Sequence, residues 1–187
     1  MKKILLAVAL LLSPLAEASN AKNYELFNQY QHNNLQYAYA YGEQYDKQGN
    51  EKTNTNRYDN KGLGYIFAAI AWKESSAGVD LTPKRDHHAY GMFQNYLKTI
   101  KAKRMQRGQK PLTDRQLIAM IMPREASAYH AMDELRYWLK VRNGNVRLAL
   151  ASYNAGWNYS KGLGYADNVL SKANYLKSKR ALEIKRD

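Results

Sequence analysis

The chain has 187 residues and no cysteine, and its 29 Lys and Arg against 16 Asp and Glu give a formal charge of +13. Its length is typical of one domain with one core, and 45% apolar with 24% charged residues exclude a disordered tail and a membrane bundle. The lack of cysteine excludes a disulfide framework, a thiolate zinc site and a cysteine nucleophile.

Residues 1–21 are predicted to be a secretory signal peptide. A start with two lysines precedes a run of nine apolar residues at 4–12, and small residues before Ala18 and Ala21 have the spacing that a signal peptidase reads. The run is too short to span a bilayer, which takes about 20 residues. The alternative is a buried N-terminal helix. Cleavage near Ala18 or Ala21 would export the protein to the periplasm or the medium, and loss of 21 residues would leave 166 residues with a charge of +12.

The basic charge has a different meaning on an exported protein than on an intracellular one. Inside a cell it would favour nucleic acid, whose phosphates attract Lys and Arg over a long range. Outside the cytoplasm, the abundant polyanions belong to the cell envelope. We therefore expect an anionic envelope surface as a partner and no nucleic acid, with simple solubility as the alternative.

The rest of the chain predicts an all-α protein, because its apolar residues recur with a helical period and β-type alternation is absent. Residues 22–58 are predicted to be an N-terminal extension, with one or two helices at 23–46 that carry a stripe of Tyr37, Tyr41 and Tyr45. A polar loop at 47–60 marks the boundary to a second unit at 59–187.

The second unit is predicted to be a series of helices joined by turns. The expected helices cover 62–76, 96–107, a segment from 113, a segment from Pro123 to Asn143-Gly144, 146–153 and 165–182. Thr113 and Gln116 have the spacing of a capping box. The pentamer Lys-Gly-Leu-Gly-Tyr occurs at 61–65 and 161–165, which we interpret as two similar helix starts.

Glu74 is the candidate catalytic acid. Leu63, Phe67 and Ile70 precede it by 11, 7 and 4 positions, so all four lie on one helical face. Partial burial there would raise the carboxyl pKa, as a general acid requires near neutral pH. The alternative is a boundary Glu that pairs with Lys73 or with a basic residue at 84–85.

Further motifs follow Glu74-Ser75 in order: Gly91-Met92-Phe93-Gln94, then Tyr153-Asn154-Ala155-Gly156, then Tyr165. Together they resemble the motifs of the lytic transglycosylase family, the Slt-type enzymes with the lysozyme-like fold, over about residues 60–175. The family pattern has Leu-Met where Met92-Phe93 stand, Ala where Ser152 stands, and often Asn-Ile near Glu125-Ala126-Ser127. These departures affect the assignment to a subgroup and the details of the substrate more than they affect the expected reaction.

The resemblance implies an enzyme that cleaves the MurNAc-GlcNAc β-1,4 bond in the glycan strands of peptidoglycan and forms 1,6-anhydro-MurNAc. Glu74 would protonate the glycosidic oxygen and then accept a proton from the C6 hydroxyl of the sugar. One carboxylate suffices, because an intramolecular nucleophile needs no activated water.

The resemblance also implies a set of substrate-binding residues, each with a structural alternative. They are Ser75, Gly91, Met92, Phe93, Gln94, Tyr153, Asn154 and Tyr165. Ser75 could instead support the loop, Met92 and Phe93 could belong to the core, and Tyr153 could be a core aromatic with a satisfied hydroxyl. The amides of Gln94 and Asn154 suit N-acetyl groups but could also cap turns.

Two other functions stay open. A lysozyme-like hydrolase would need a second carboxylate, about 5 Å away for retention or about 6.5–9.5 Å for inversion, and the candidates are Asp80, Asp86 and Glu125. A wall-binding or assembly protein would need no acid. His87-His88 lacks ligand spacing, so we expect no metal and no cofactor. The setting is open between wall turnover, a secretion or conjugation apparatus, and a phage.

Overall fold

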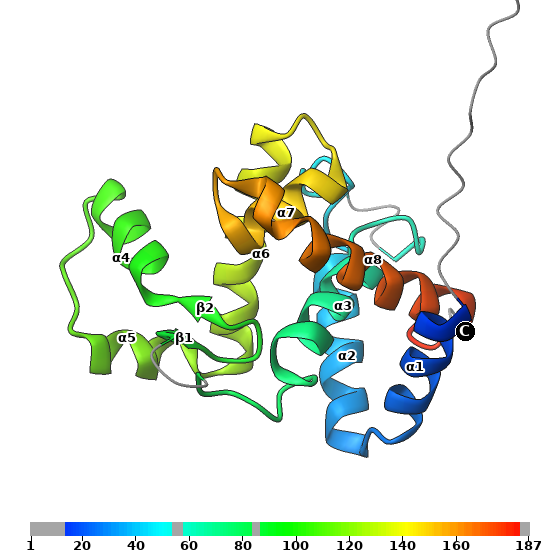
Figure 1. Ribbon diagram of the computed structural model, residues 1–187. Helices are drawn as coiled ribbons and strands as arrows, with labels where there is room; N and C mark the ends of the chain where they lie inside the picture. The colour runs from blue at the N-terminus through cyan, green and yellow to red at the C-terminus, as the bar shows by residue number, and fades with distance from the viewer. Residues whose placement is uncertain (1–13, 54–57, 84–86, 184–187) are drawn as a thin grey trace, which may run out of the picture.

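The computed structural model describes residues 14–53, 58–83 and 87–183 (Figure 1). These residues form helices α1 (Pro14–Glu25), α2 (Gln29–Gly42), α3 (Gly64–Ser75), α4 (Leu97–Gln106), α5 (Asp114–Ile121), α6 (Arg124–Val141), α7 (Val146–Ala155) and α8 (Leu163–Ser178), with a 3-10 helix η2 (Tyr159–Gly162) before α8. The predicted all-α class is confirmed. The expected capping box of Thr113 and Gln116 is present at the start of α5.

Helix α3 lies at the centre of the main core and packs against both α2 and α8. Its residues Phe67, Ala68, Ile70 and Ala71 are fully buried. Burying a large apolar side chain contributes roughly 1.5–3 kcal/mol, and the small alanines allow the neighbouring helices to approach closely. Nine of the twelve residues of the helix that carries Glu74 are therefore buried.

The start of α3 is held by a carboxylate from outside the helix. Glu43, which directly follows α2, is fully buried and accepts hydrogen bonds from the backbone amides of Gly62 at 3.1 Å and Gly64 at 3.2 Å. Lys52 neutralises it at 3.5 Å. A negative charge at this end is favourable, because the first amides of a helix lack partners.

The predicted pair of helix starts is confirmed, since α3 begins within 61–65 and α8 begins within 161–165. Both copies of the pentamer use a glycine to bring the backbone close to another segment. A Cβ on Gly62 would lie 2.8 Å from the carbonyl oxygen of Tyr45, and one on Gly162 would lie 2.1 Å from that of Ala151.

The predicted tyrosine stripe is also confirmed, because Tyr41 has its ring centroid 6.2 Å from that of Tyr37 and 6.1 Å from that of Tyr45. Helix α2 carries buried Leu35 and Tyr39 in the same core as α3. The division between residues 22–58 and 59–187 stays a prediction, but α2 contributes directly to the packing of the second unit.

Helices α4 and α5 form a lobe that projects to one side of the molecule (Figure 1). The lobe has a small core of its own, made by Leu97, Ile100, Leu117 and Ile121. Asp133 on α6 ties it to the body through ion pairs with Lys103 and Arg107, both at 2.8 Å.

A two-stranded antiparallel sheet, β1 (Ala89–Tyr90) and β2 (Asn95–Tyr96), joins the body to this lobe. Ala89 pairs with Tyr96, and Tyr90 pairs with Asn95. The sheet was not predicted, because strands of two residues are too short to show alternation. The turn between them, residues 91–94, is joined to the end of α3 by the hydrogen bond from the Ser75 hydroxyl to the Met92 carbonyl.

The apolar run of the predicted signal peptide, 4–12, lies outside the described residues. Ala18 and Ala21 belong to α1, and Asn20 between them donates a hydrogen bond of 3.0 Å to the Ser171 hydroxyl on α8. Cleavage at either site stays a prediction, and only the site near Ala18 would retain this contact. Within the described ranges, every helix is too short or too polar to cross a membrane.

Candidate active site

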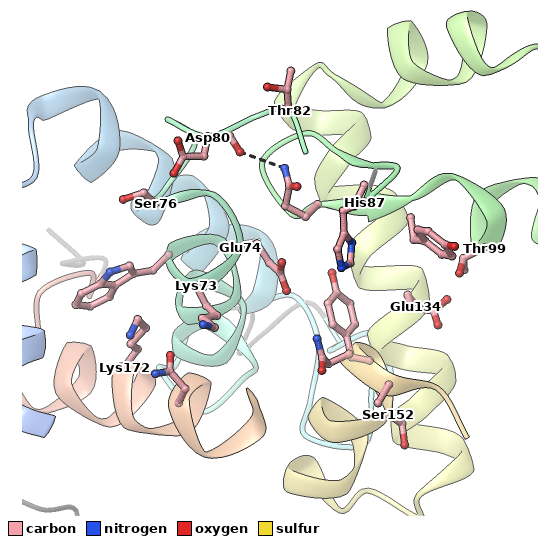
Figure 2. Close-up of a pocket in the computed structure, with 18 of the residues that line it drawn as sticks. Lys73, Glu74, Ser76, Asp80, Thr82, His87, Thr99, Glu134, Ser152 and Lys172 are labelled. Atoms are coloured by element: carbon pink, nitrogen blue, oxygen red, sulfur yellow. Dashed lines mark hydrogen bonds between the residues drawn. The ribbon is translucent and has the colours of Figure 1, made fainter. Parts of the chain in front are cut away.

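A groove of about 1280 Å³ crosses the molecule at the end of α3. Its lining residues come from α1, α2, α3, the β1–β2 segment, α4, α6, α7 and α8. Glu74 lies in the middle, and its side chain points into the open space between the two sides (Figure 2).

The backbone places Glu74 at this point because α3 ends directly after it. Ser76, Ala77 and Gly78 all have positive φ angles of 52°, 58° and 94°, so the chain turns away from the helix axis. Glu74 is half-buried, and the hydroxyl of Tyr165 on α8 donates a hydrogen bond of 2.5 Å to its Oε1. The acid is thus fixed by a partner from a distant part of the chain.

The environment of Glu74 favours its neutral form. Burial raises the pKa of the carboxyl to about 7, against the lowering effects of the Tyr165 hydrogen bond and of the nearby Lys73 and His87. A carboxyl with this pKa holds its proton for a large fraction of the time at neutral pH, and it can also give the proton up. Such a group is suited to act first as a general acid and then as a base.

Two tyrosines stand beside the acid. The rings of Tyr153 and Tyr165 are stacked, with centroids 6.4 Å apart and an angle of 19° between the planes. Burial and the neighbouring Glu74 hold the pKa of each phenol well above its usual value. Tyr153 donates a hydrogen bond of 3.3 Å to the carbonyl of Phe93, and its side chain lines the groove. Tyr165 acts through Glu74 and does not line the groove.

Ser75 does not lie in the groove, although the resemblance implied that it binds substrate. It is fully buried, and its hydroxyl donates 2.6 Å to the carbonyl of Met92 and accepts 2.8 Å from the amide of Gly78. The hydroxyl therefore joins the end of α3 to the β1–β2 turn. These contacts agree with the alternative expectation that Ser75 supports the loop.

Gly91, Met92 and Phe93 are likewise not among the groove-lining residues, and their part in substrate binding stays a prediction. Met92 and Phe93 are 2% and 0% exposed, and Phe93 stacks on Phe67 with centroids 4.2 Å apart. Gly91 has a φ of +80°, and a Cβ there would lie 2.7 Å from both the Ile121 carbonyl and the Ser127 hydroxyl. The turn packs inward because its small and apolar residues fill the space between α3 and α6.

Two of the motif departures have a structural explanation. The Ser127 hydroxyl on α6 accepts hydrogen bonds from the Phe93 amide at 3.1 Å and the Asn95 side chain at 2.9 Å. The Ser152 hydroxyl on α7 accepts one from Arg142 at 2.9 Å. Both serines therefore anchor segments that form the walls of the groove.

Gln94 and Asn154 do line the groove. The Gln94 amide nitrogen donates to the backbone carbonyls of Asp80 and Gly91, each at 3.1 Å, and Figure 2 marks the first of these bonds. These bonds fix the side chain across the turn. Asn154 at the end of α7 is exposed, so its amide is free to meet a ligand in the groove.

The carboxylates considered for a second catalytic role are in different places. Asp80 lines the groove, Glu125 lies outside it and pairs with Arg124 at 3.2 Å, and Asp86 lies outside the described residues. Lys84 and Arg85, proposed partners of Glu74, also lie outside them. Lys73 influences Glu74 by its charge, but Tyr165 is the hydrogen-bond partner.

Sequence reasoning missed several groove residues. Glu134 on α6 lines the groove, where Lys103 pairs with it at 2.7 Å and the Trp138 indole donates 2.6 Å to it. Trp72, Lys73, Asn168 and Lys172 line it on the side of α3 and α8. These residues share no motif, because they lie on helices that are far apart in the sequence and come together only in the folded chain.

His87 lines the groove, and Figure 2 shows its imidazole pointing into it. Within the described parts of the chain, no group of three or more His, Asp or Glu side chains could hold a metal ion.

A family model described as the transglycosylase SLT domain matches residues 54–173. A protein of Enterobacteria phage T4, described as an uncharacterized 20.7 kDa protein in the vs-regB intergenic region, is 47% identical over 187 residues and covers all of both chains. No solved structure matches the chain significantly.

Proposed function

The chain belongs to the transglycosylase SLT domain family of peptidoglycan-cleaving enzymes, and we propose that it is a lytic transglycosylase. It cleaves the MurNAc-GlcNAc β-1,4 glycosidic bond of a glycan strand and leaves 1,6-anhydro-MurNAc at the new end. The observation that carries this proposal is the placement of Glu74, a carboxyl with a pKa of about 7 in the middle of a long groove.

The reaction needs one group that gives a proton and then takes one. Neutral Glu74 donates its proton to the glycosidic oxygen, the bond from C1 of MurNAc to that oxygen breaks, and an oxocarbenium-like centre forms. The C6 hydroxyl of the same sugar attacks C1, and the Glu74 carboxylate accepts the hydroxyl proton. The acid ends the cycle protonated, and no water is consumed.

The other residues of the site support these two proton transfers. The Tyr165 hydroxyl stabilises the carboxylate that exists between the steps, because its hydrogen bond of 2.5 Å favours the charged form. The amides of Gln94 and Asn154 line the groove: Asn154 offers a donor and an acceptor, and Gln94, whose N–H groups bind backbone carbonyls, offers its carbonyl oxygen, which suits the N–H of an N-acetyl substituent.

A lysozyme-like hydrolase is the second candidate, and the observation in its favour is that Asp80 and Glu134 line the same groove as Glu74. A hydrolase needs such a group as nucleophile or as base for water. Glu134 is bound by Lys103 and Trp138, which lowers its availability as a base. A wall-binding protein without turnover is the third candidate, but it would have no use for an acid with a raised pKa.

The products separate these functions. Mass spectrometry of muropeptides released from purified sacculi should detect ends that are lighter by one water and carry anhydro sugars. Reducing ends would point to the hydrolase, and unaltered sacculi with bound protein would favour the wall-binding protein.

Glu74→Gln tests the acid directly. The substitution keeps the shape and removes the proton, so lysis of sacculi should fall by at least about 100-fold, while the far-UV circular dichroism and the binding to sacculi are retained. Glu125→Gln is the matched control, because this carboxylate is exposed outside the groove, and it should lyse like the parent. Lysis by the Glu74 variant at the parent rate would refute the assignment.

The proposed location follows from the predicted signal peptide: the enzyme acts outside the cytoplasm, and its basic surface is attracted to the anionic envelope. The similarity to a phage T4 protein favours a phage setting over wall turnover or a secretion or conjugation apparatus.

A further inference from the structure

One side of the groove carries two lysines beside the acid. Lys73 lies next to Glu74 on α3, Lys172 lies on α8, and Trp72 and Asn168 complete the lining between them. We call these four residues the cationic arm. Figure 2 shows Lys73 and Lys172 on one side of Glu74, while His87, Glu134 and Ser152 lie on the other.

Among the described residues, neither ammonium group forms an ion pair with a carboxylate, although the charge of Lys73 acts on the neighbouring Glu74. The Lys172 Nζ lies 5.1 Å above the Trp72 ring, and its polar contact is a long one of 3.4 Å to the Asn20 side chain. Burial and the charge of Lys73 lower the pKa of Lys172 below its usual value. Asp80 also lines the groove, but Figure 2 places it beyond Ser76, away from Lys172.

Lys103, whose partner Glu134 lines the other side of the groove, differs in this respect. Lys103 pairs with Asp133 at 2.8 Å and with Glu134 at 2.7 Å. These ion pairs neutralise the charge of Lys103 within the protein. Lys73 and Lys172, by contrast, line the groove. An anion bound between them would reduce the repulsion between their charges.

We propose that the cationic arm binds a carboxylate carried by the MurNAc residue at the scissile bond, and so selects charged glycan strands over neutral ones. This inference rests on the proposed function, because it places the strand in the groove. A carboxylate between two ammonium groups accepts charge-assisted hydrogen bonds from both. The carboxylate could belong to the stem peptide or, on strands without peptide, to the lactyl group.

A binding experiment tests the arm without depending on turnover. The Glu74→Gln protein serves as the parent, so that no ligand is consumed, and calorimetry measures its Kd for three oligosaccharides of equal length. One carries stem peptides, one has been stripped of peptide by an amidase and carries free lactyl carboxylates, and one is a neutral N-acetylglucosamine oligomer.

Lys172→Gln and Lys73→Gln, each added to this parent, should weaken binding of the carboxylate ligands about tenfold, the scale of one charge-assisted contact. Binding of the neutral oligomer should change less than twofold. Lys177→Gln is the matched control, because this lysine is exposed on the same helix outside the groove, and it should bind all three ligands like the parent. Lys172→Arg keeps the charge and should restore most of the affinity, which separates charge from packing against Trp72.

Each outcome has a defined meaning. A loss with the peptide-bearing ligand alone identifies the stem peptide as the source. A loss with the stripped ligand alone identifies the lactyl group, whose carboxylate is free only there, and a loss with both means that the arm accepts either carboxylate. An equal loss with the neutral oligomer, or no loss with any ligand, overturns the proposal. Because Kd is measured without catalysis, a failure here leaves the product analysis untouched, and a hydrolase that binds charged strands would still show the effect.

Discussion

Removing the hydroxyl of Tyr165 should change the pH range in which the enzyme works. This hydroxyl donates 2.5 Å to Oε1 of Glu74, and the hydrogen bond lowers the pKa of that carboxyl against the larger effect of burial. In Tyr165→Phe the carboxylate loses a donor while the carboxyl stays buried. The neutral form is then favoured further, so the pKa of Glu74 rises.

The size of the change follows from the energy of the lost bond. A hydrogen bond to a charged group contributes about 1.5–3 kcal/mol, and one pKa unit corresponds to about 1.4 kcal/mol. Glu74 is half-buried, so water replaces part of the loss. We therefore expect a rise of about one unit, from about 7 to about 8.

The assay is the pH dependence of kcat/KM, measured as lysis of purified sacculi between pH 5 and pH 9 at constant ionic strength. Because the first step needs the protonated acid, activity should fall as pH rises through the pKa of the free enzyme. The alkaline limb should lie near pH 7 in the parent protein and about one unit higher in Tyr165→Phe.

Tyr153→Phe is the control, because its hydroxyl donates to the Phe93 carbonyl and not to Glu74. Its alkaline limb should stay close to that of the parent. An unchanged limb in Tyr165→Phe, or a limb displaced to lower pH, would refute the argument that this hydrogen bond acts on the acid. A thermal unfolding curve for each variant checks that the fold is retained.

Three further predictions concern stability and charge. Gly91→Ala should lower the free energy of unfolding by about 1–3 kcal/mol, because an alanine is strained at a positive φ and its Cβ would meet the Ile121 carbonyl. Gly164→Ala on α8, where the space around the glycine is open, should leave that free energy unchanged or raise it by up to about 1 kcal/mol. Chemical denaturation of both variants measures the difference. Ser75→Ala should cost about 1–3 kcal/mol by the same measurement, because it leaves the Met92 carbonyl without its donor. Raising the ionic strength should weaken association with sacculi in a pull-down, and salt-independent association would mean that the basic charge is not what holds the protein there.

The sequence predicted the helices well because helical periodicity and caps are local signals. The α5 capping box, the α3 stripe that ends near Glu74, and the stop after α6 each depend on residues within one or two turns. The β1–β2 pair could not be predicted in this way, because its two-residue strands form only where the turn packs against Ser127.

The site could be predicted in part, because its motifs are also local in the sequence. A motif names residues that are near each other in sequence, but it does not say which side of the backbone faces the groove. Gln94 and Tyr153 line the groove, whereas Met92 and Phe93 from the same turn belong to the core. Lys172 had no motif at all, since it reaches the groove through the packing of α8 on α3.

Glu43 gives the segment before the family-matched region a direct part in placing the acid. The match begins at residue 54, yet Glu43, which accepts the amide hydrogen of Gly64 at the start of α3, lies before it. Phe27, also before it, has its ring centroid 5.3 Å from that of Trp72. A protein shortened to the matched region would lose the Glu43 carboxylate that binds the start of α3, while Glu74 lies at the other end of the same helix. We therefore expect that the smallest fragment of this chain with a correctly placed Glu74 includes residues before position 54.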